Sequence, residues 1–202
     1  MGQPPSPSYA TVYFGIHEIR ILKRLPGALI PHNRRYIDDY IGVWIPMQNG
    51  GCERMWNKFK KEMNNYHGLT WEFSERTDKV DYLDVTISID NGKITFDLYE
   101  KSLNLYLYIP PLSAHPPGVL SGLVLGNCHR IYTLVSKPED QRRHLTNFFR
   151  RLLRRGYQRS TLLPLFQRAS SHAHHPRPST ITNIITKASP AFFHNQYHPD
   201  AP

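Results

Sequence analysis

Two adjacent carboxylates, Asp38 and Asp39, are the residues of this sequence best suited to carry chemistry. They interrupt a segment of strand-forming residues, where neighbouring negative charges repel each other and lose hydration. A bound Mg²⁺ would compensate for both effects, because it prefers carboxylate oxygens together with substrate phosphates. Two such ions can activate an attacking hydroxyl and stabilise the leaving oxygen of a phosphoryl transfer. The alternative is a solvated Asp-Asp turn that only hydrogen-bonds its own backbone.

A short β-hairpin is expected to position the acid pair. Strand-forming residues lie on both sides of the acids within residues 35–44, which places the carboxylates at the turn. A helix is expected before the hairpin, over residues 6–25, with Ser6 as its cap and Pro7 in its first turn. Apolar side chains recur along this helix at three- and four-residue spacing and predict its buried face: Tyr9, Val12, Tyr13, Ile16 and Ile19.

The remaining pattern predicts an α+β fold, in which a helix and a β-meander precede a purely helical region. The helix over residues 53–66 is expected to pack on a sheet through apolar residues at helical spacing: Met55, Trp56, Phe59 and Met63. Three strands are expected at 69–73, 82–89 and 93–99, with a hairpin turn at Asp90-Asn91-Gly92, and three helices at 118–135, 138–155 and 161–169.

The segment Tyr36-Ile37-Asp38-Asp39 resembles the Tyr-x-Asp-Asp signature of reverse transcriptases. Residues 1–7, Met-Gly-Gln-Pro-Pro-Ser-Pro, are similar to the Gly-x-Pro-x-Ser-Pro turn that precedes a helix and the acidic hairpin in that family. Further blocks resemble the Penelope-like branch of retroelement polymerases: residues 82–87, 92–94, 98–101 and 108–117, Arg130 and Arg155-Gly156-Tyr157. The resemblance covers about residues 1–170 in consistent order.

This resemblance implies a fragment of an RNA-directed DNA polymerase. Residues 1–113 would form the later part of the palm, an antiparallel sheet with helices on one face. Residues 114–170 would form a helical thumb, and residues 171–202 a disordered tail. Asp38 would bind the two catalytic Mg²⁺ ions, and Asp39 would assist or hold that site together. The implied partners are an RNA template, a DNA primer and deoxynucleoside triphosphates.

The resemblance also assigns roles around the acids. Tyr36 would lie near the primer end or the incoming nucleotide. Gly2, Ser6 and Pro7 would belong to the turn that contacts template and nucleotide. The strand over residues 83–85 would approximate the primer grip.

Two features of the family are missing. Its other metal-binding aspartate lies on a strand before the Gly-x-Pro-x-Ser-Pro turn, whereas the only carboxylate before Asp38 is Glu18, on the expected helix. Asp84 is a conceivable substitute, although a solvent-facing position on a strand explains it more simply. The family's lysine after the hairpin has no assignable counterpart among Glu72, Glu75, Arg76 and Lys79.

The missing carboxylate bears directly on activity. Two-metal catalysis needs ligands on both sides of the ions, so the chain, which is expected to start inside a polymerase, is expected to be inactive alone. The alternative function is a non-catalytic nucleic-acid-binding remnant of a retroelement.

Positive charge concentrates in the expected thumb. The chain carries 25 basic and 16 acidic side chains, net +9, and residues 137–168 alone have an excess of seven positive charges. Arg143, Arg150 and Arg154 fall opposite an apolar helix stripe and, with Lys101, are expected to bind backbone phosphates. A solvated basic face is the alternative. Tyr106 and Tyr108 could stack on bases or pack on the thumb.

Composition excludes several other classes. No apolar run approaches the roughly 20 residues of a membrane-spanning helix, and no secretion signal is recognisable, so no membrane partner and a nuclear or cytoplasmic location are expected. Cys52 and Cys128 indicate buried thiols rather than a disulfide framework or zinc site. Core positions are expected for the three tryptophans. The residues His172, His174 and His175 could bind a transition metal, but disorder is preferred. No endonuclease domain is expected after residue 170.

Overall fold

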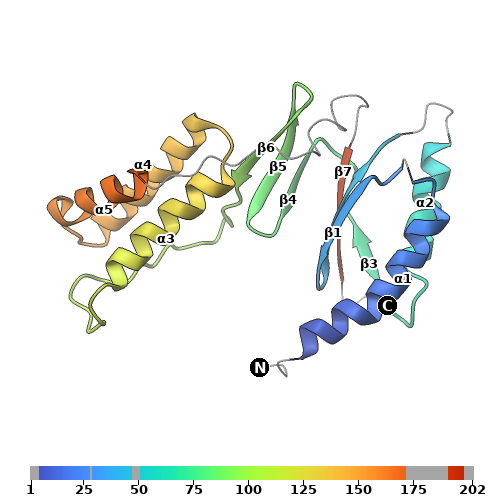
Figure 1. Ribbon diagram of the computed structural model, residues 1–202, viewed down its shortest axis with the longest axis horizontal. Helices are drawn as coiled ribbons and strands as arrows, with labels where there is room; N and C mark the ends of the chain where they lie inside the picture. Colours follow the sequence, from blue (N-terminus) through green and yellow to red (C-terminus); the bar gives the residue numbers. More distant parts are fainter. Residues whose placement is uncertain (1–4, 28, 47–50, 172–190, 198–202) are drawn as a thin grey trace. The chain divides into compact units, whose positions relative to one another are not determined.

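A computed structural model describes residues 5–27, 29–46, 51–171 and 191–197 of the chain (Figure 1). These residues form an α+β structure with five helices and two small antiparallel sheets. The helices are α1 (Ser6–Arg24), α2 (Cys52–Met63), α3 (Val119–Leu134), α4 (Pro138–Arg154) and α5 (Arg159–Ser171). The strands are β1 (His32–Tyr36), β2 (Asp39–Trp44), β3 (Trp71–Phe73), β4 (Lys79–Tyr82), β5 (Val85–Asp90), β6 (Lys93–Leu98) and β7 (Ala191–Tyr197).

The chain divides into two compact units. Unit 1 comprises residues 1–83, 88–94 and 180–202, and unit 2 comprises residues 84–87 and 95–179. The change from one unit to the other falls within the sheet β4-β5-β6, upstream of the expected boundary at residue 113.

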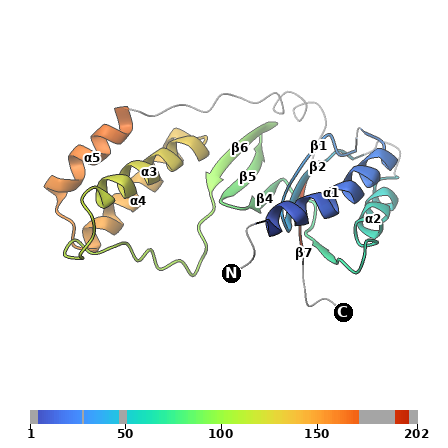
Figure 2. The ribbon, with the colours of Figure 1, turned by 60° about the horizontal axis from the view of Figure 1, so that its bottom comes forward.

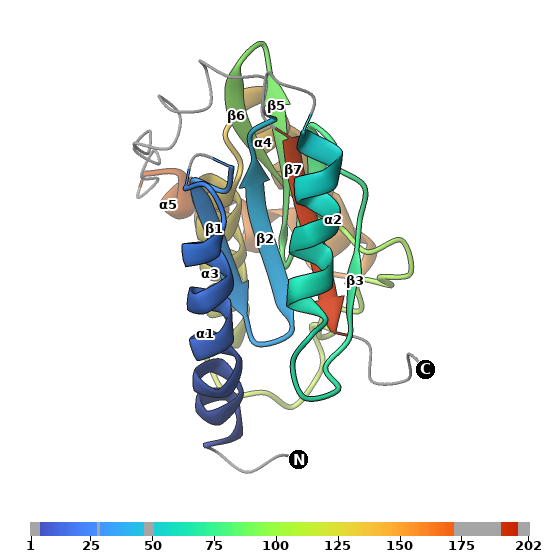
Figure 3. The same cartoon turned by 90° about the vertical axis from the view of Figure 1, so that its right-hand side faces the viewer.

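Unit 1 contains a four-stranded sheet of order β1-β2-β7-β3, with every neighbouring pair antiparallel. Figure 3 shows α1 and α2 on the same face of this sheet. The core between them is rich in aromatic side chains, because the spacing of α2 directs Trp56, Phe59 and Met63 toward Trp44 of β2 and Trp71 of β3. All three tryptophans are buried, which confirms the expected core positions.

Helix α1 forms where the spacing predicts it, but it buries a different face. Phe14 and Ile21 enter the core, whereas the five residues of the predicted apolar face are 49–72% exposed. The prediction fails because α1 has apolar residues on more than one side, so periodicity alone cannot select the packed side. Pro7 lies in the first turn as expected, but Ser6 does not cap the helix, since Pro5 occupies the cap position.

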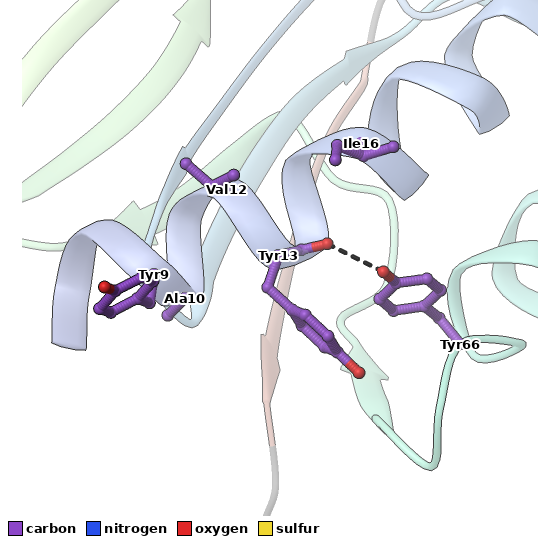
Figure 4. A pocket seen from close by; sticks show the side chains of 6 residues that line it. All are labelled: Tyr9, Ala10, Val12, Tyr13, Ile16 and Tyr66. Atoms are coloured by element: carbon purple, nitrogen blue, oxygen red, sulfur yellow. Dashed lines mark hydrogen bonds between the residues drawn. The ribbon is translucent and has the colours of Figure 1, made fainter.

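The exposed side of α1 forms an open hollow together with Tyr66 (Figure 4). Tyr66 donates its hydroxyl hydrogen to the carbonyl oxygen of Tyr13 at 3.0 Å, and its ring stacks on His17 at 4.3 Å between centroids. These contacts fix Tyr66 at the edge of an apolar surface that also includes Tyr9, Val12 and Ile16.

Strand β7 lies inside the region that the sequence predicts to be a disordered tail. Ala191–Tyr197 pairs with both β2 and β3, so the prediction is wrong for these seven residues. The segment contains two phenylalanines and a tyrosine, which favour strands once a partner edge is present. Residues 172–190 and 198–202, including the predicted histidine cluster, lie outside the described residues.

The second sheet has the order β4-β5-β6. Asn91 and Gly92 connect β5 to β6 with left-handed φ angles of 49° and 73°, as the Asn-Gly signal predicts. The strand predicted over residues 82–89 is instead split by a turn at Leu83-Asp84, where Leu83 has a φ of 52°. No glycine, asparagine or proline marks this turn, and the alternating pattern therefore conceals it.

Unit 2 contains three packed helices, as predicted (Figure 2). Their core joins Val124 and Cys128 of α3 to Phe148 and Leu152 of α4 and Leu162 of α5. Gly156 turns the chain away from the direction of α4 just after the last helical residue, Arg154. The φ of Gly156, 102°, lets the amides of Gly156 and Tyr157 donate to the carbonyls of Leu153 and Leu152. Burial raises the pKa of the Cys128 thiol to about 12, and Cys52 is half-buried; both are free thiols.

Among the described residues, no helix is long and apolar enough to cross a membrane.

Candidate functional site

The acid pair lies at the tip of a β-hairpin, as the sequence predicts. β1 and β2 pair in register from His32 opposite Val43 to Tyr36 opposite Asp39, which leaves Ile37 and Asp38 as a two-residue turn. Asp38 is exposed in this turn, and Asp39 is half-buried at the first position of β2. The hairpin is longer than expected, because β1 begins at His32.

The backbone of the tip is strained at Ile37. Its φ of 55° lies in the left-handed region, where a β-branched side chain crowds the following carbonyl. Such strain persists only where surrounding contacts enforce it, and it concentrates at functional sites.

Arg35 supplies those contacts from the strand just before the turn. Its Nη1 donates a hydrogen bond to the carbonyl oxygen of Ile37 at 3.0 Å, and its Nη2 donates one to the carbonyl oxygen of Thr11 at 2.8 Å. Its Nε donates to Oε2 of Glu18 at 2.9 Å, and its guanidinium lies 5.3 Å from the ring centroid of Phe14. The Arg35 side chain is only 5% exposed, so this network fixes the acidic turn to α1.

Glu18 is fully engaged on α1. Its Oε2 accepts from Arg35, and its Oε1 accepts a hydrogen bond from Nδ2 of Asn33 at 3.0 Å. The only carboxylate that precedes Asp38 in the chain therefore serves to hold the hairpin in place.

The charge of Asp39 is felt by Tyr82 at the end of β4. Burial raises the pKa of the Tyr82 hydroxyl, the negative charge of Asp39 raises it further, and Arg35 opposes both. The pKa of Tyr40, the residue after Asp39, is raised by burial and by the charge of Glu18. Burial is the largest cause of both pKa shifts, and the neighbouring carboxylates Asp39 and Glu18 add to it.

The described residues do not complete a site for the two expected Mg²⁺ ions. Asp38 and Asp39 provide oxygen donors from one hairpin, but no group of three His, Cys, Asp or Glu side chains gathers within the described part of the chain. Asp84, the conceivable substitute, lies in unit 2 and forms an ion pair with Arg130 at 3.0 Å. Within the described residues, Asp38 and Asp39 would supply ligands on only one side of a two-metal site.

The other residues to which the resemblance assigns a role lie at different places in the chain and are described one by one. Tyr36 closes the hairpin opposite Asp39 and is 60% exposed, which leaves its ring accessible beside the acids. Ser6 and Pro7 form the first turn of α1. Gly2 lies outside the described residues. Of the expected primer-grip residues 83–85, Leu83 and Asp84 form the turn between β4 and β5, and Val85 is the first residue of β5.

Two of the predicted phosphate-binding arginines in unit 2 have no ion-pair partner among the described residues. Arg150 and Arg154 are exposed on α4, and neither forms an ion pair with a described residue. Arg143 differs, because its Nη2 lies 2.7 Å from Oδ2 of Asp97 and 3.0 Å from Oδ1 of Asp140. Lys101 is exposed in the loop after β6.

A cluster of charged and polar side chains, in which only His144 is buried, joins the end of β6 and the residues after it to α4. His144 donates from Nε2 to Oδ1 of Asp97 at 2.6 Å, and its Nδ1 lies 3.8 Å from Oε1 of Glu100. Arg151 donates two hydrogen bonds to Glu100, at 2.9 and 3.1 Å. Sequence reasoning missed this cluster; the polar Gln141 and His144 on the apolar side of α4 were its only signal.

Tyr106 and Tyr108 pack against α4 in unit 2. The guanidinium of Arg151 lies 3.3 Å from the ring centroid of Tyr106, and the ring of Tyr108 meets Phe148 edge to face at 5.4 Å. Of the two roles that the sequence left open, stacking on bases and packing within the protein, the structure shows the packing.

Comparisons of this chain with protein-family models, with curated proteins and with solved structures find no match.

Proposed function

We propose that this chain is part of an RNA-directed DNA polymerase of the Penelope-like type, with unit 1 as a partial palm and unit 2 as a thumb. The observation that carries the proposal is the Tyr36-x-Asp38-Asp39 segment at a β-hairpin tip, with Asp38 in the turn and Asp39 opening β2. The Arg35–Glu18 pair holds this tip and keeps Ile37 in a strained backbone conformation, as expected where carboxylates must be presented in a fixed geometry.

In this function Asp38 and Asp39 would hold one side of a two-Mg²⁺ site, and the ions would supply the activated hydroxyl and the stabilised leaving group of nucleotide addition. Tyr36, exposed beside the acids, would contact the primer end or the incoming nucleotide. A polypeptide outside the described residues would contribute the remaining carboxylate.

Unit 2 would grip the primer–template duplex. Exposed arginines on a helix whose other side is packed can bind backbone phosphates without reading sequence. Arg150 and Arg154 are the best candidates, because Arg143 already has two carboxylate partners.

A non-catalytic, duplex-binding remnant of a retroelement is the second candidate. Its support is the incomplete donor set around the acid pair, since Glu18 is engaged by Arg35 and Asn33.

Primer extension separates the two candidates. The chain is produced with the polypeptide encoded immediately upstream, and extension of a DNA primer on an RNA template is measured with Mg²⁺. A polymerase loses extension on Asp38→Asn and keeps it on the control Asp78→Asn, which removes an exposed acid just before β4. Extension that survives Asp38→Asn contradicts the metal assignment, and its absence in the unaltered protein favours the remnant.

A further inference from the structure

The outward face of α1 is apolar and open to solvent. It lies opposite Phe14 and Ile21, which enter the core of unit 1. Five side chains make up this face, and each is 49–72% exposed: Tyr9, Val12, Tyr13, Ile16 and Ile19. A helix that is apolar on two sides is normally buried on both, and a continuous apolar surface on a soluble protein marks an interaction site. The outward face of α1 therefore has the composition of an interface.

The hollow beside Tyr66 gives this face a defined shape (Figure 4). The hydrogen bond from Tyr66 to the Tyr13 carbonyl and the stacking of Tyr66 on His17 hold one wall of the hollow in place. Ala10, next to the larger Tyr9 and Tyr13, contributes only a methyl group and leaves the hollow open. Ordered tyrosines are frequent anchors of protein interfaces, because they bury a large area at a low cost in side-chain entropy. The hollow is thus suited to receive an apolar side chain of a partner.

The same face ends in positive charge. Arg20 and Lys23 each follow an apolar residue of the face by four positions, so they continue it toward the C-terminal end of α1. Both are exposed, and neither has an ion-pair partner among the described residues, whereas Arg24 pairs with Glu62 of α2 at 3.4 Å. The outward face of α1 therefore has an apolar end and a basic end.

This arrangement of charge defines the partner. Another helix can pack along the face when its own apolar residues recur at three- and four-residue spacing. In the antiparallel orientation, the first turn of that helix lies beside Arg20 and Lys23. Acidic side chains are favoured in this turn by the two cations and by the dipole of their own helix.

A second copy of α1 does not supply this chemistry. The first turn of α1 contains no acidic residue, and the only carboxylate of the helix, Glu18, is engaged by Arg35 and Asn33. Two copies of α1 in parallel would bring their basic ends together, which is unfavourable. Charge complementarity thus selects an acidic partner over self-association.

We propose that the outward face of α1 docks an amphipathic helix of a partner protein in the antiparallel orientation. The apolar stripe of the partner helix lies on the hollow beside Tyr66, and its acidic first turn lies on Arg20 and Lys23. The surface includes no residue of the acidic hairpin, so the docking does not depend on the proposed polymerase function.

Synthetic helical peptides test the proposal. Each has about 18 residues, enough for an isolated helix, and carries leucines at three- and four-residue spacing on one side. The first peptide has glutamates in its first turn, the second has lysines there, and the third has the glutamates in its last turn. The labelled peptides are titrated by fluorescence anisotropy into the full chain and its variants.

The first peptide should bind the unaltered chain at least about tenfold more tightly than the other two. Arg20→Glu with Lys23→Glu should reverse the preference in favour of the lysine peptide. The control, Lys58→Glu with Lys61→Glu, makes the same change of charge at exposed positions of α2 and should leave the order of affinities unchanged. Val12→Ser with Ile16→Ser should weaken binding of the first peptide about tenfold.

All substituted positions are exposed, so each variant should keep the tryptophan emission of the unaltered chain. The proposal is overturned if the first peptide does not bind, if the charge reversals on α1 and α2 act alike, or if the third peptide binds best. Sedimentation tests self-association: a dimer that Val12→Ser with Ile16→Ser dissociates would assign the face to a second copy. Displacement of the first peptide by a single-stranded oligouridylate would make the tyrosines a base-stacking surface and would also overturn the proposal.

Discussion

Arg35 donates its Nε hydrogen to Oε2 of Glu18 at 2.9 Å, in a pair whose side chains are 5% and 13% exposed. The same guanidinium also binds the carbonyl oxygens of Thr11 and Ile37, so one side chain joins α1 to the acidic turn.

Arg35→Ala should lower the free energy of unfolding of unit 1 by about 3 kcal/mol, because it leaves the buried Glu18 carboxylate without its counter-ion. Urea denaturation followed by tryptophan fluorescence measures the change, because all three tryptophans lie in unit 1. Arg34→Ala, on the neighbouring exposed position, is the control and should stay within about 0.5 kcal/mol of the unaltered protein. Equal effects at the two positions would contradict the bridging role of Arg35.

Glycine should be more stabilising than alanine at position 37. At a φ of 55° alanine keeps the Cβ crowding that glycine lacks, so Ile37→Gly should exceed Ile37→Ala in unfolding free energy by about 1 kcal/mol. At Arg34, an ordinary strand position, the order should reverse. Thermal denaturation of the four variants checks the inversion, and the same order at both sites would exclude strain at Ile37.

Acid should weaken the attachment of β6 to α4. Burial tends to raise the pKa of Asp97, but hydrogen bonds from His144 and the Leu98 amide and the charge of Arg143 outweigh it and lower that pKa. The Glu100 pKa is lowered chiefly by its hydrogen bonds from Arg151, against an opposing effect of burial. Carboxyls with lowered pKa stabilise the fold fully above their unfolded value, about 4, and lose that contribution as pH falls through the folded value.

The urea concentration at the midpoint of unit 2 unfolding should therefore decrease as the pH is lowered from about 5 to about 3. Asp97→Asn combined with Glu100→Gln should flatten this dependence, which helix circular dichroism measures. The control is Asp81→Asn on β4, an exposed acid of unit 1. An equally steep fall in the double variant would show that other groups control the acid response.

Duplex binding should depend on the exposed arginines of α4. Arg150→Ala with Arg154→Ala should weaken binding to an RNA–DNA duplex about tenfold at 0.1 M salt and reduce the salt slope by about two. Lys58→Ala with Lys61→Ala removes the same charge from exposed positions of α2 and should have little effect. Filter binding across salt concentrations measures both pairs. Equal losses would mean that only net charge matters.

Local sequence patterns predicted where helices, strands and turns form better than they predicted which of these elements pack or pair with each other. The hairpin around Asp38, the apolar spacing of α2 and the Asn91-Gly92 turn follow from neighbouring residues, and all three are confirmed. The buried side of α1 did not follow, because apolar residues lie on more than one side of this helix and the core takes Phe14 and Ile21. The turn at Leu83-Asp84 and the pairing of β7 were both missed. The turn contains no glycine, asparagine or proline, and the pairing depends on strands far away in the sequence.

The same distinction between local and long-range features applies to the candidate site. The positions of Asp38 and Asp39 on a hairpin could be predicted from flanking strand formers, whereas the engagement of Glu18 and Arg143 depends on residues brought together only by folding. Sequence spacing identifies where charges lie on an element, but not which charges are neutralised by another element.

Because Trp44, Trp56 and Trp71 are all buried in unit 1, intrinsic tryptophan fluorescence can report on this unit. Unit 2 contains no tryptophan, so indole emission reports on the aromatic core around the acidic hairpin alone, while most of the helical ellipticity arises from α3, α4 and α5. A single titration recorded in both signals therefore shows whether the two units melt together or one after the other.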